Sequence, residues 1–230
     1  MPAMTVRKER KSAAAIEDSR FVVIDTELTG LDERRDSLVS IGAVRMQGGR
    51  IGMGDTFYRM INPRRSLTSE SVLIHGITPS EVETKPAVDV VLREFLEYCG
   101  DDIIVGFCVS IDMGFLGREA ERLFGHAVGN PAIDIQRVFE WLLGRGFFPG
   151  GAGVGLPRRY QLYDIARYFD IEVNGAHNAL IDAFITAQIF QRFIPAVVRA
   201  GIKRSEELVG ISRKFKGGER QHYFSGMFGF

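Results

Sequence analysis

Apolar residues near the start of the folded part of the chain fall into short runs that have the length and composition of β-strands. Such runs occupy residues 21–25, 38–46 and 50–61 and are rich in β-branched and aromatic residues. Gln47-Gly48-Gly49 separates the second run from the third and is typical of a hairpin turn. The sequence therefore predicts a three-stranded meander that ends at Asn62-Pro63.

From residue 68 onward, apolar residues recur at helical spacing, and short apolar runs separate the helices. Val91, Leu92 and Phe95, for example, share one face of a helix that Pro86 begins and Gly100 ends. The predicted helices are 68–75, 86–99, 112–124, 135–144, 159–169 and 178–199, and the further strands are 103–107 and 132–134. Consecutive strands followed by alternating helices and strands predict an α/β domain whose mixed sheet carries helices on its faces.

We expect a single domain at 20–200 with a flexible N-terminal extension at 1–19 and a C-terminal extension at 201–230. The composition is that of a soluble globular protein, with 45% hydrophobic and 25% charged residues. A net charge of zero argues against a basic protein that coats nucleic acid, but it allows an enzyme that contacts a few phosphates.

The sequence favours a cytoplasmic protein without membrane contact. Residues 1–20 lack the apolar core of a secretory signal, and no apolar stretch approaches the length that spans a bilayer. Cys99 and Cys108 have no metal-binding or redox spacing, so we expect free thiols.

Two acids directly follow the first predicted strand. In an extended chain, Asp25 and Glu27 lie on the same face, where their carboxylates repel each other unless a cation lies between them. Hard divalent ions such as Mg²⁺ prefer these oxygen ligands. An Asx-type turn that ends the strand is the alternative, because the Asp-x-Glu pattern is common by chance.

Three further polar residues lie next to apolar elements. Asp112 follows the strand 103–107, where ligands gather in α/β sheets, but taken alone it is better explained as a helix N-cap. Asp182 lies in a helix that is apolar around most of its circumference, so it is either buried with a partner or exposed on a narrow polar strip. His177, five residues earlier, has a side chain suited to general-base catalysis, but a single histidine near a helix start is often structural.

Together these residues resemble the DEDDh exonucleases, the family of the proofreading epsilon subunit of bacterial DNA polymerase III. The resemblance covers residues 20–195, and several short motifs in the family's order make it more specific than any one of them. The five-residue offset from His177 to Asp182 is that of the histidine branch, whereas the sister group has a tyrosine four positions before its last aspartate. The motifs are Asp25 to Leu31, Asn62-Pro63, Ile74 to Thr78, Gly106 to Leu116 and His177 to Ala187.

The resemblance implies a ribonuclease-H-like fold, with a five-stranded mixed sheet flanked by helices. It also implies that the protein hydrolyses nucleic acid from the 3′ end and releases nucleoside monophosphates, using two Mg²⁺ or Mn²⁺ ions about 4 Å apart. Carried onto this sequence, the family's roles fall to the cation ligands Asp25, Glu27, Asp112 and Asp182, the general base His177, and the substrate-binding residues Thr29, Gly30, Leu31 and His75.

One motif departs from the family pattern. Phe107, Cys108 and Ile111 stand where the family usually carries a His-Asn pair and an aromatic residue. Such positions orient the ligands of a metal ion, so we expect the change to affect cation affinity and substrate preference.

Three functions fit these observations. The first is an exonuclease for single-stranded or frayed DNA ends, and the second is a related enzyme that trims RNA. The third is a subunit associated with a DNA polymerase or clamp through the aromatic tail 211–230, with weak nuclease activity. The alternative for the tail is that its aromatic residues fold back on the domain.

Overall fold

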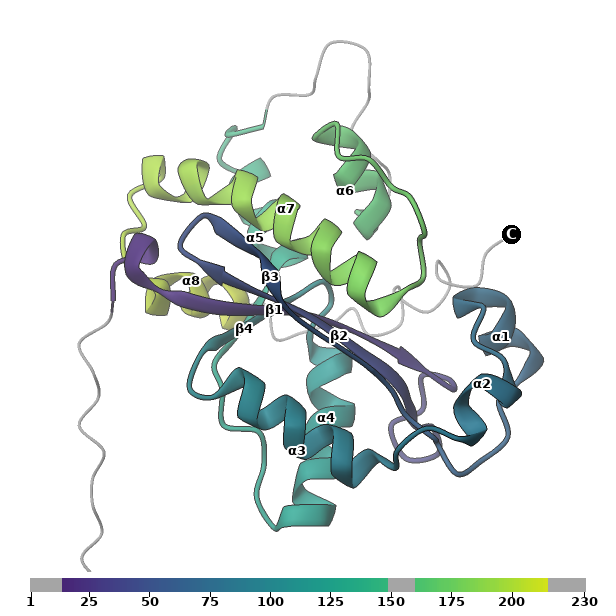
Figure 1. The fold of residues 1–230 in the computed structure, drawn as a ribbon. Coiled ribbons are helices and arrows are strands. Elements are labelled where there is room, and N and C mark those ends of the chain that lie inside the picture. Colours follow the sequence, from purple (N-terminus) through teal and green to yellow (C-terminus); the bar gives the residue numbers. More distant parts are fainter. Residues whose placement is uncertain (1–13, 149–159, 215–230) are drawn as a thin grey trace, which may run out of the picture.

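A five-stranded mixed sheet forms the centre of the computed structural model, which describes residues 14–148 and 160–214 (Figure 1). The strand order is β3-β2-β1-β4-β5, with β1, β2 and β3 antiparallel and β4 and β5 parallel to β1. The strands are β1 (Arg20–Leu28), β2 (Leu38–Gln47), β3 (Arg50–Met60), β4 (Ile103–Gly106) and β5 (Ala132–Asp134). The predicted fold class is confirmed, and β1 is the central strand of the sheet.

Helices cover both faces of the sheet, with α7 on one side and α3 and α4 on the other (Figure 1). Helices α5, α6 and α8 pack with α7 in one hydrophobic core on that side of the sheet. A short 3₁₀ helix, η1, covers Ile16–Asp18. The α-helices are α1 (Ser69–His75), α2 (Pro79–Glu83), α3 (Val88–Cys99), α4 (Ser110–Phe124), α5 (Ile135–Leu143), α6 (Leu162–Tyr168), α7 (Ala179–Arg199) and α8 (Ser205–Lys214).

The alternation of side chains along β1 explains why helices are needed on both faces. Phe21 and Val23 are buried in the core under α7, whereas Val22 and Ile24 are buried in the core formed with α3 and α4. A strand that is apolar on both faces must lie in the middle of a sheet covered on each side. The same alternation assigns each later residue of β1 to one face or the other.

The packed unit extends past both predicted boundaries. Ile16 is buried, and its amide nitrogen donates to the carbonyl of Lys203 at 3.0 Å. Helix α8, which the sequence analysis did not predict, buries Leu208 and Val209 in the core of α7. Residues 14–19 and 201–214 therefore belong to the domain, while most of the predicted N-terminal extension (1–13) and the aromatic end of the tail (215–230) lie outside the described residues.

Helix α7 corrects one sequence-based expectation. By length and hydropathy this 21-residue helix is capable of spanning a membrane, contrary to the prediction that no segment approaches that length. However, 61% of its most apolar window is buried inside the fold, where it lies against β1 and β2. Its apolar surface is therefore explained by its position in the core.

Candidate active site

Asp25 and Glu27 lie within β1 and project from the same face as Phe21 and Val23, toward α7. The strand continues to Leu28, so the alternative of an Asx-type turn at Asp25 is wrong. Glu27 is only 8% exposed, although it carries a carboxylate. The sheet thus holds two acids side by side beneath the start of α7.

Helix α7 brings a third acid to this pair. Its N-terminus is capped by Asn178, whose Oδ1 accepts hydrogen bonds from the amides of Leu180 and Ile181 at 3.1 and 3.3 Å. Asp182 in the first turn is 4% exposed, so the alternative of an exposed position is wrong. Asp25, Glu27 and Asp182 each offer one ligand atom, and the three atoms lie within 4.8 Å of one another.

The close approach of α7 to the sheet depends on a glycine. Gly42 in β2 pairs with Asp25, and a Cβ atom at this position would lie 2.2 Å from the backbone carbon of Ala179. The helix therefore crosses the sheet directly beside the acids, at a point where no other residue would fit.

Asp112 reaches the site from the opposite face of the sheet. Strand β4 pairs with residues 21–23 of β1, so within the described part of the chain no strand pairs with the later residues of β1 on that side. The start of α4 follows there. Thr26, which projects away from α7, donates a hydrogen bond from Oγ1 to Asp112 Oδ1 at 2.6 Å. Asp112 lies within the first turn of α4 and is not its N-cap, so that alternative is wrong.

The electrostatics of the site favour bound cations. Burial, together with the charges of the neighbouring acids, raises the pKa of Asp25 well above its usual range and that of Glu27 to about 8. Burial also raises the pKa of Asp112 to about 7, although the hydrogen bond from Thr26 opposes this. One oxygen of Asp182, Oδ1, is buried without a hydrogen-bond partner among the described residues. Crowded buried carboxylates with a free oxygen fit divalent cations, which compensate their charge.

His177 stands at the entrance to the cluster, exposed to solvent. Its backbone has φ 63°, in the left-handed region that few non-glycine residues adopt. The imidazole is close enough to Asp182 and to His75 to influence the pKa of each. The structure thus brings the predicted general base next to the predicted cation ligands.

The predicted substrate-binding residues line one small cavity beside Glu27. Thr29, Gly30, Leu31 and His75 all border it, together with Thr26, Leu28, Thr68, Glu70, Ser71 and Ile74. The hydroxyl of Thr29 is already bonded within the loop, since it donates to Asp36 Oδ1 at 2.9 Å and accepts from the amide of Ser37. His75 Nε2, in contrast, is buried without a hydrogen-bond partner among the described residues.

The residues that depart from the family pattern lie between the end of β4 and the first turn of α4. Cys108 has φ 51°, and its amide donates to Asp134 Oδ1 at 3.2 Å while its thiol contacts Gln136 Oε1 at the same distance. Burial is the main cause of the raised pKa of this thiol, and the nearby Asp134 and Asp112 add to it. Cys108 connects the loop before α4 to the start of α5.

Sequence reasoning missed two contributors to the site. Thr26 lies between two acids but on the other face of the strand, and only the shortness of β4 makes its contact with Asp112 possible. Tyr163 in α6 donates from its hydroxyl to Asp182 Oδ2 at 2.8 Å, although 19 residues separate the two. No motif in the sequence signals either contact.

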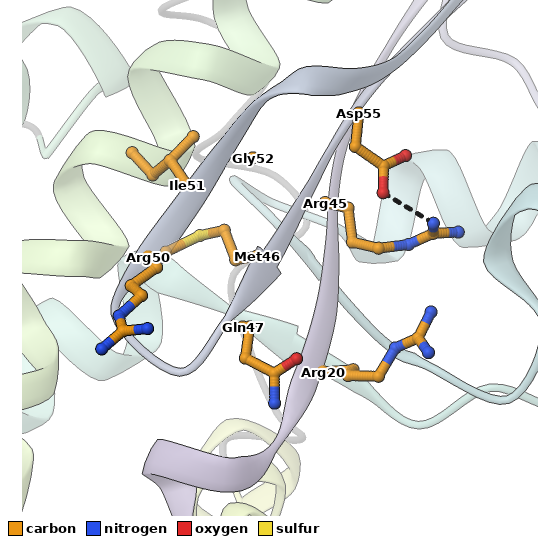
Figure 2. A pocket seen from close by; sticks show the side chains of 8 residues that line it. All are labelled: Arg20, Arg45, Met46, Gln47, Arg50, Ile51, Gly52 and Asp55. Atoms are coloured by element: carbon orange, nitrogen blue, oxygen red, sulfur yellow. Dashed lines mark hydrogen bonds and ion pairs between the residues drawn. The ribbon is translucent and has the colours of Figure 1, made fainter.

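A second hollow lies at the other end of β1 and is rich in arginine (Figure 2). Arg45 pairs with Asp55 at 2.8 Å and with Asp102 at 3.3 Å, and Arg20 pairs with Asp102 at 3.1 Å. The aspartates thus offset most of this positive charge. These ion pairs join β1, β2 and β3 to the turn between α3 and β4 and give no indication of a ligand.

Comparison with known proteins identifies the family. The sequence model of the exonuclease family (RNase_T) matches residues 22–190, from β1 into α7. This chain belongs to the exonuclease family. The matched range includes the four predicted cation ligands and the predicted general base, Asp25, Glu27, Asp112, Asp182 and His177. The predicted resemblance is thereby confirmed. The exonuclease is an enzyme that hydrolyses phosphodiester bonds, in a family that depends on divalent metal ions.

Curated relatives of this exonuclease include DNA polymerase III proteins. It is 34% identical to DNA polymerase III subunit epsilon of Aquifex aeolicus over 177 aligned residues. The alignment covers 77% of this chain and 81% of that protein. It is also 34% identical over 191 residues to a PolC-type DNA polymerase III of Thermotoga maritima, covering 83% of this chain but only 13% of the polymerase.

Solved structures share the fold of this exonuclease. E. coli exonuclease I in complex with a dT13 oligonucleotide matches with a TM-score of 0.66 and 20% identity, over 80% of this chain and 43% of that one. Exonuclease X in complex with 5′ overhanging duplex DNA matches with a TM-score of 0.60 and 22% identity, over 84% of this chain and 99% of that one. At these identities the likeness establishes the fold alone.

Proposed function

We propose that this exonuclease removes nucleotides from the 3′ end of single-stranded or frayed DNA and releases nucleoside monophosphates. The observation that carries the proposal is the convergence of Asp25, Glu27 and Asp182, from two distant segments, to within 4.8 Å beside Asp112 and His177. The names of the relatives, a DNA polymerase III subunit and PolC-type polymerases, favour DNA as the substrate.

The four acids are the proposed ligands of two Mg²⁺ or Mn²⁺ ions. Asp25, Glu27 and Asp182 offer oxygens from the α7 side of β1, and Asp112 completes the set from the open edge of the strand. When bound, the two cations stabilise the negative charge that develops on the phosphate and on the leaving oxygen.

His177 is the proposed general base. Its exposed imidazole takes a proton from the attacking water, whose oxygen then forms the new bond to phosphorus. The bond from phosphorus to the 3′-oxygen of the preceding nucleotide breaks, and that oxygen acquires a proton. The terminal nucleotide lies in the cavity lined by Thr29, Gly30, Leu31 and His75.

The test is cleavage of a 3′-labelled oligonucleotide with Mg²⁺ or Mn²⁺. We expect the wild type to release the label, Asp25→Ala to lose this activity, and a chelator to abolish it. Glu121→Ala, an exposed acid on α4, is the matched control and retains activity. Undiminished cleavage by Asp25→Ala, or no cleavage by the wild type, contradicts the proposal.

The role of His177 has its own measurement. His177→Ala is expected to slow cleavage by about 10²–10⁴-fold, the usual contribution of a general base, while cation binding is retained. A loss of less than tenfold would remove His177 from this role.

DNA and RNA oligonucleotides of one sequence distinguish the preferred substrate from the alternative of RNA trimming. Contacts to a ribose 2′-hydroxyl are what would favour RNA. Faster release from DNA supports the proposal, and faster release from RNA replaces it with the alternative.

We further propose that the protein associates with a DNA polymerase in the cytoplasm, where the free thiols Cys99 and Cys108 fit a reducing compartment. The proposed docking segment is the tail, of which residues 215–230 lie outside the described residues. Removal of 215–230 is expected to abolish capture of the polymerase III catalytic subunit while leaving the melting temperature unchanged. A collapse of the fold would instead indicate that the tail packs on the domain.

A further inference from the structure

A single tyrosine hydroxyl joins two of the proposed functional residues. Tyr163 Oη donates a hydrogen bond to Asp182 Oδ2 at 2.8 Å and accepts one from the backbone amide of His177 at 2.9 Å. The same amide also reaches Asp182 Oδ2, at 3.0 Å. The rings of Tyr163 and His177 meet edge to face, with centroids 5.4 Å apart. Tyr163, His177 and Asp182 thus form a closed triangle at the edge of the acidic cluster.

The two carboxylate oxygens of Asp182 differ in their hydrogen bonding. Oδ2 accepts two hydrogen bonds, which orient the carboxylate. Oδ1 is buried and has no hydrogen-bond partner among the described residues. A buried carboxylate oxygen without a partner is costly, whereas a cation ligand needs a free oxygen. The contacts to Oδ2 therefore determine which oxygen of Asp182 remains available to the cluster.

We propose that Tyr163 is a positioning residue of the cation site, whose hydroxyl holds Asp182 Oδ2 and the His177 amide so that Oδ1 faces the bound ion. The inference rests on the proposed function for the existence of that ion. Partners that orient a metal ligand in this way normally change cation affinity when they are removed. Tyr163 acts through Asp182 and does not itself contact the substrate.

The packing of α6 allows the hydroxyl to be removed without disturbing the fold. Leu162, Ile165 and Ala166 are the buried residues of this helix, and they hold it in the core of α7. Tyr163 is only half-buried. Tyr163→Phe keeps the aromatic ring and these apolar contacts and deletes only the oxygen that bonds to Asp182 and His177.

The experiment measures Mn²⁺ binding to the full-length protein without nucleic acid, from the electron paramagnetic resonance signal of free Mn²⁺. We expect the dissociation constant to rise by about 10–100-fold in Tyr163→Phe. Tyr160→Phe is the matched control, because that ring packs edge-on against Phe139 and its hydroxyl has no hydrogen bond within the described residues. Its affinity is expected to equal that of the wild type.

Cleavage assays supply a second readout. The Mn²⁺ concentration that gives half-maximal activity is expected to rise by the same factor in Tyr163→Phe, and excess Mn²⁺ is expected to restore most of the rate. A purely structural role would instead lower the melting temperature and leave the Mn²⁺ requirement unchanged.

The outcomes separate this inference from the proposed function. If Tyr163→Phe binds Mn²⁺ as tightly as Tyr160→Phe, the positioning role is overturned, whether or not the wild type cleaves DNA. If the wild type cleaves nothing but Tyr163→Phe still weakens Mn²⁺ binding, the inference stands and the proposed function fails. A wild type that binds no Mn²⁺ overturns both.

Discussion

Replacing Gly42 by alanine should move Asp182 on α7 away from Asp25 and Glu27 on β1. Gly42 lies in β2 opposite Asp25, and the backbone of α7 passes directly over it. An added Cβ would lie 2.2 Å from the carbon of Ala179 and 2.3 Å from the nitrogen of Leu180. Both are backbone atoms at the start of the helix, so no side-chain rotation relieves the overlap.

The size of the displacement follows from these distances. Ordinary van der Waals contact of a Cβ begins at 3.4 Å, so the first turn of α7 must retreat by about 1.2 Å (3.4 Å less 2.2 Å). Asp182 lies in that turn and would move away from Asp25 and Glu27. A misplacement of about 1 Å at a reacting centre lowers activity by about 10²-fold, and overpacking costs about 1–3 kcal/mol.

The assay combines cleavage of a 3′-labelled oligonucleotide with thermal unfolding. We expect Gly42→Ala to lose about 10²-fold in rate and about 2–12 °C in melting temperature. Gly54→Ala is the matched control, because a Cβ at that position in β3 meets no atom within 4 Å. If Gly42→Ala has the rate and melting temperature of Gly54→Ala, the argument that close helix–strand contact builds the site is refuted.

Three other predictions follow from the site and from the fold. The folded protein holds the pKa of Glu27 at about 8, above its ordinary 4.5, so the cation-free native state binds more protons than the unfolded chain. The melting temperature of the protein in chelator should therefore fall as pH rises from about 4.5 to 8. Glu27→Gln should flatten this dependence, and parallel curves for the two proteins would contradict the assignment. Thr26→Val removes the hydroxyl that donates to Asp112 and should weaken Mn²⁺ binding by about tenfold or more, whereas Thr26→Ser should keep the wild-type affinity. Equal Mn²⁺ affinities of the two variants would exclude a role of the Thr26 hydroxyl in orienting Asp112. Leu208→Ala should lower the free energy of unfolding, measured in urea, by about 2–5 kcal/mol because Leu208 is fully buried. A decrease as small as that caused by Glu206→Ala, at an exposed position of the same helix, would mean that α8 is not part of the core.

The sheet followed from local patterns, whereas the candidate site residues were named by the resemblance to the DEDDh exonucleases. The runs 21–25, 38–46 and 50–61 became β1, β2 and β3. β1 and β2 are buried and therefore apolar, whereas the largely exposed edge strand β3 was indicated by the hairpin turn at 47–49. Helices α3, α4, α5 and α7 began and ended within two residues of their predicted bounds, since apolar periodicity and terminal signals coincide there.

Other features depend on contacts between distant segments. Helix α8 shows little beyond a short apolar pattern in the sequence. Helix α2 is the exception, because Pro79 and the capping box of Thr78 and Glu81 are local signals. The contact between Thr26 and Asp112 requires knowing that β4 pairs with only three residues of β1. The contact between Tyr163 and Asp182 requires knowing how α6 packs on α7.

The separation along the chain between β1 and α7 has a consequence for biosynthesis. Asp25 leaves the ribosome early, whereas Asp182 and the capping residue Asn178 emerge more than 150 residues later. Until then a nascent chain holds two or three of the acids without the helix that closes over them. The full set of acids that the proposed function requires therefore exists only after α7 docks on β1.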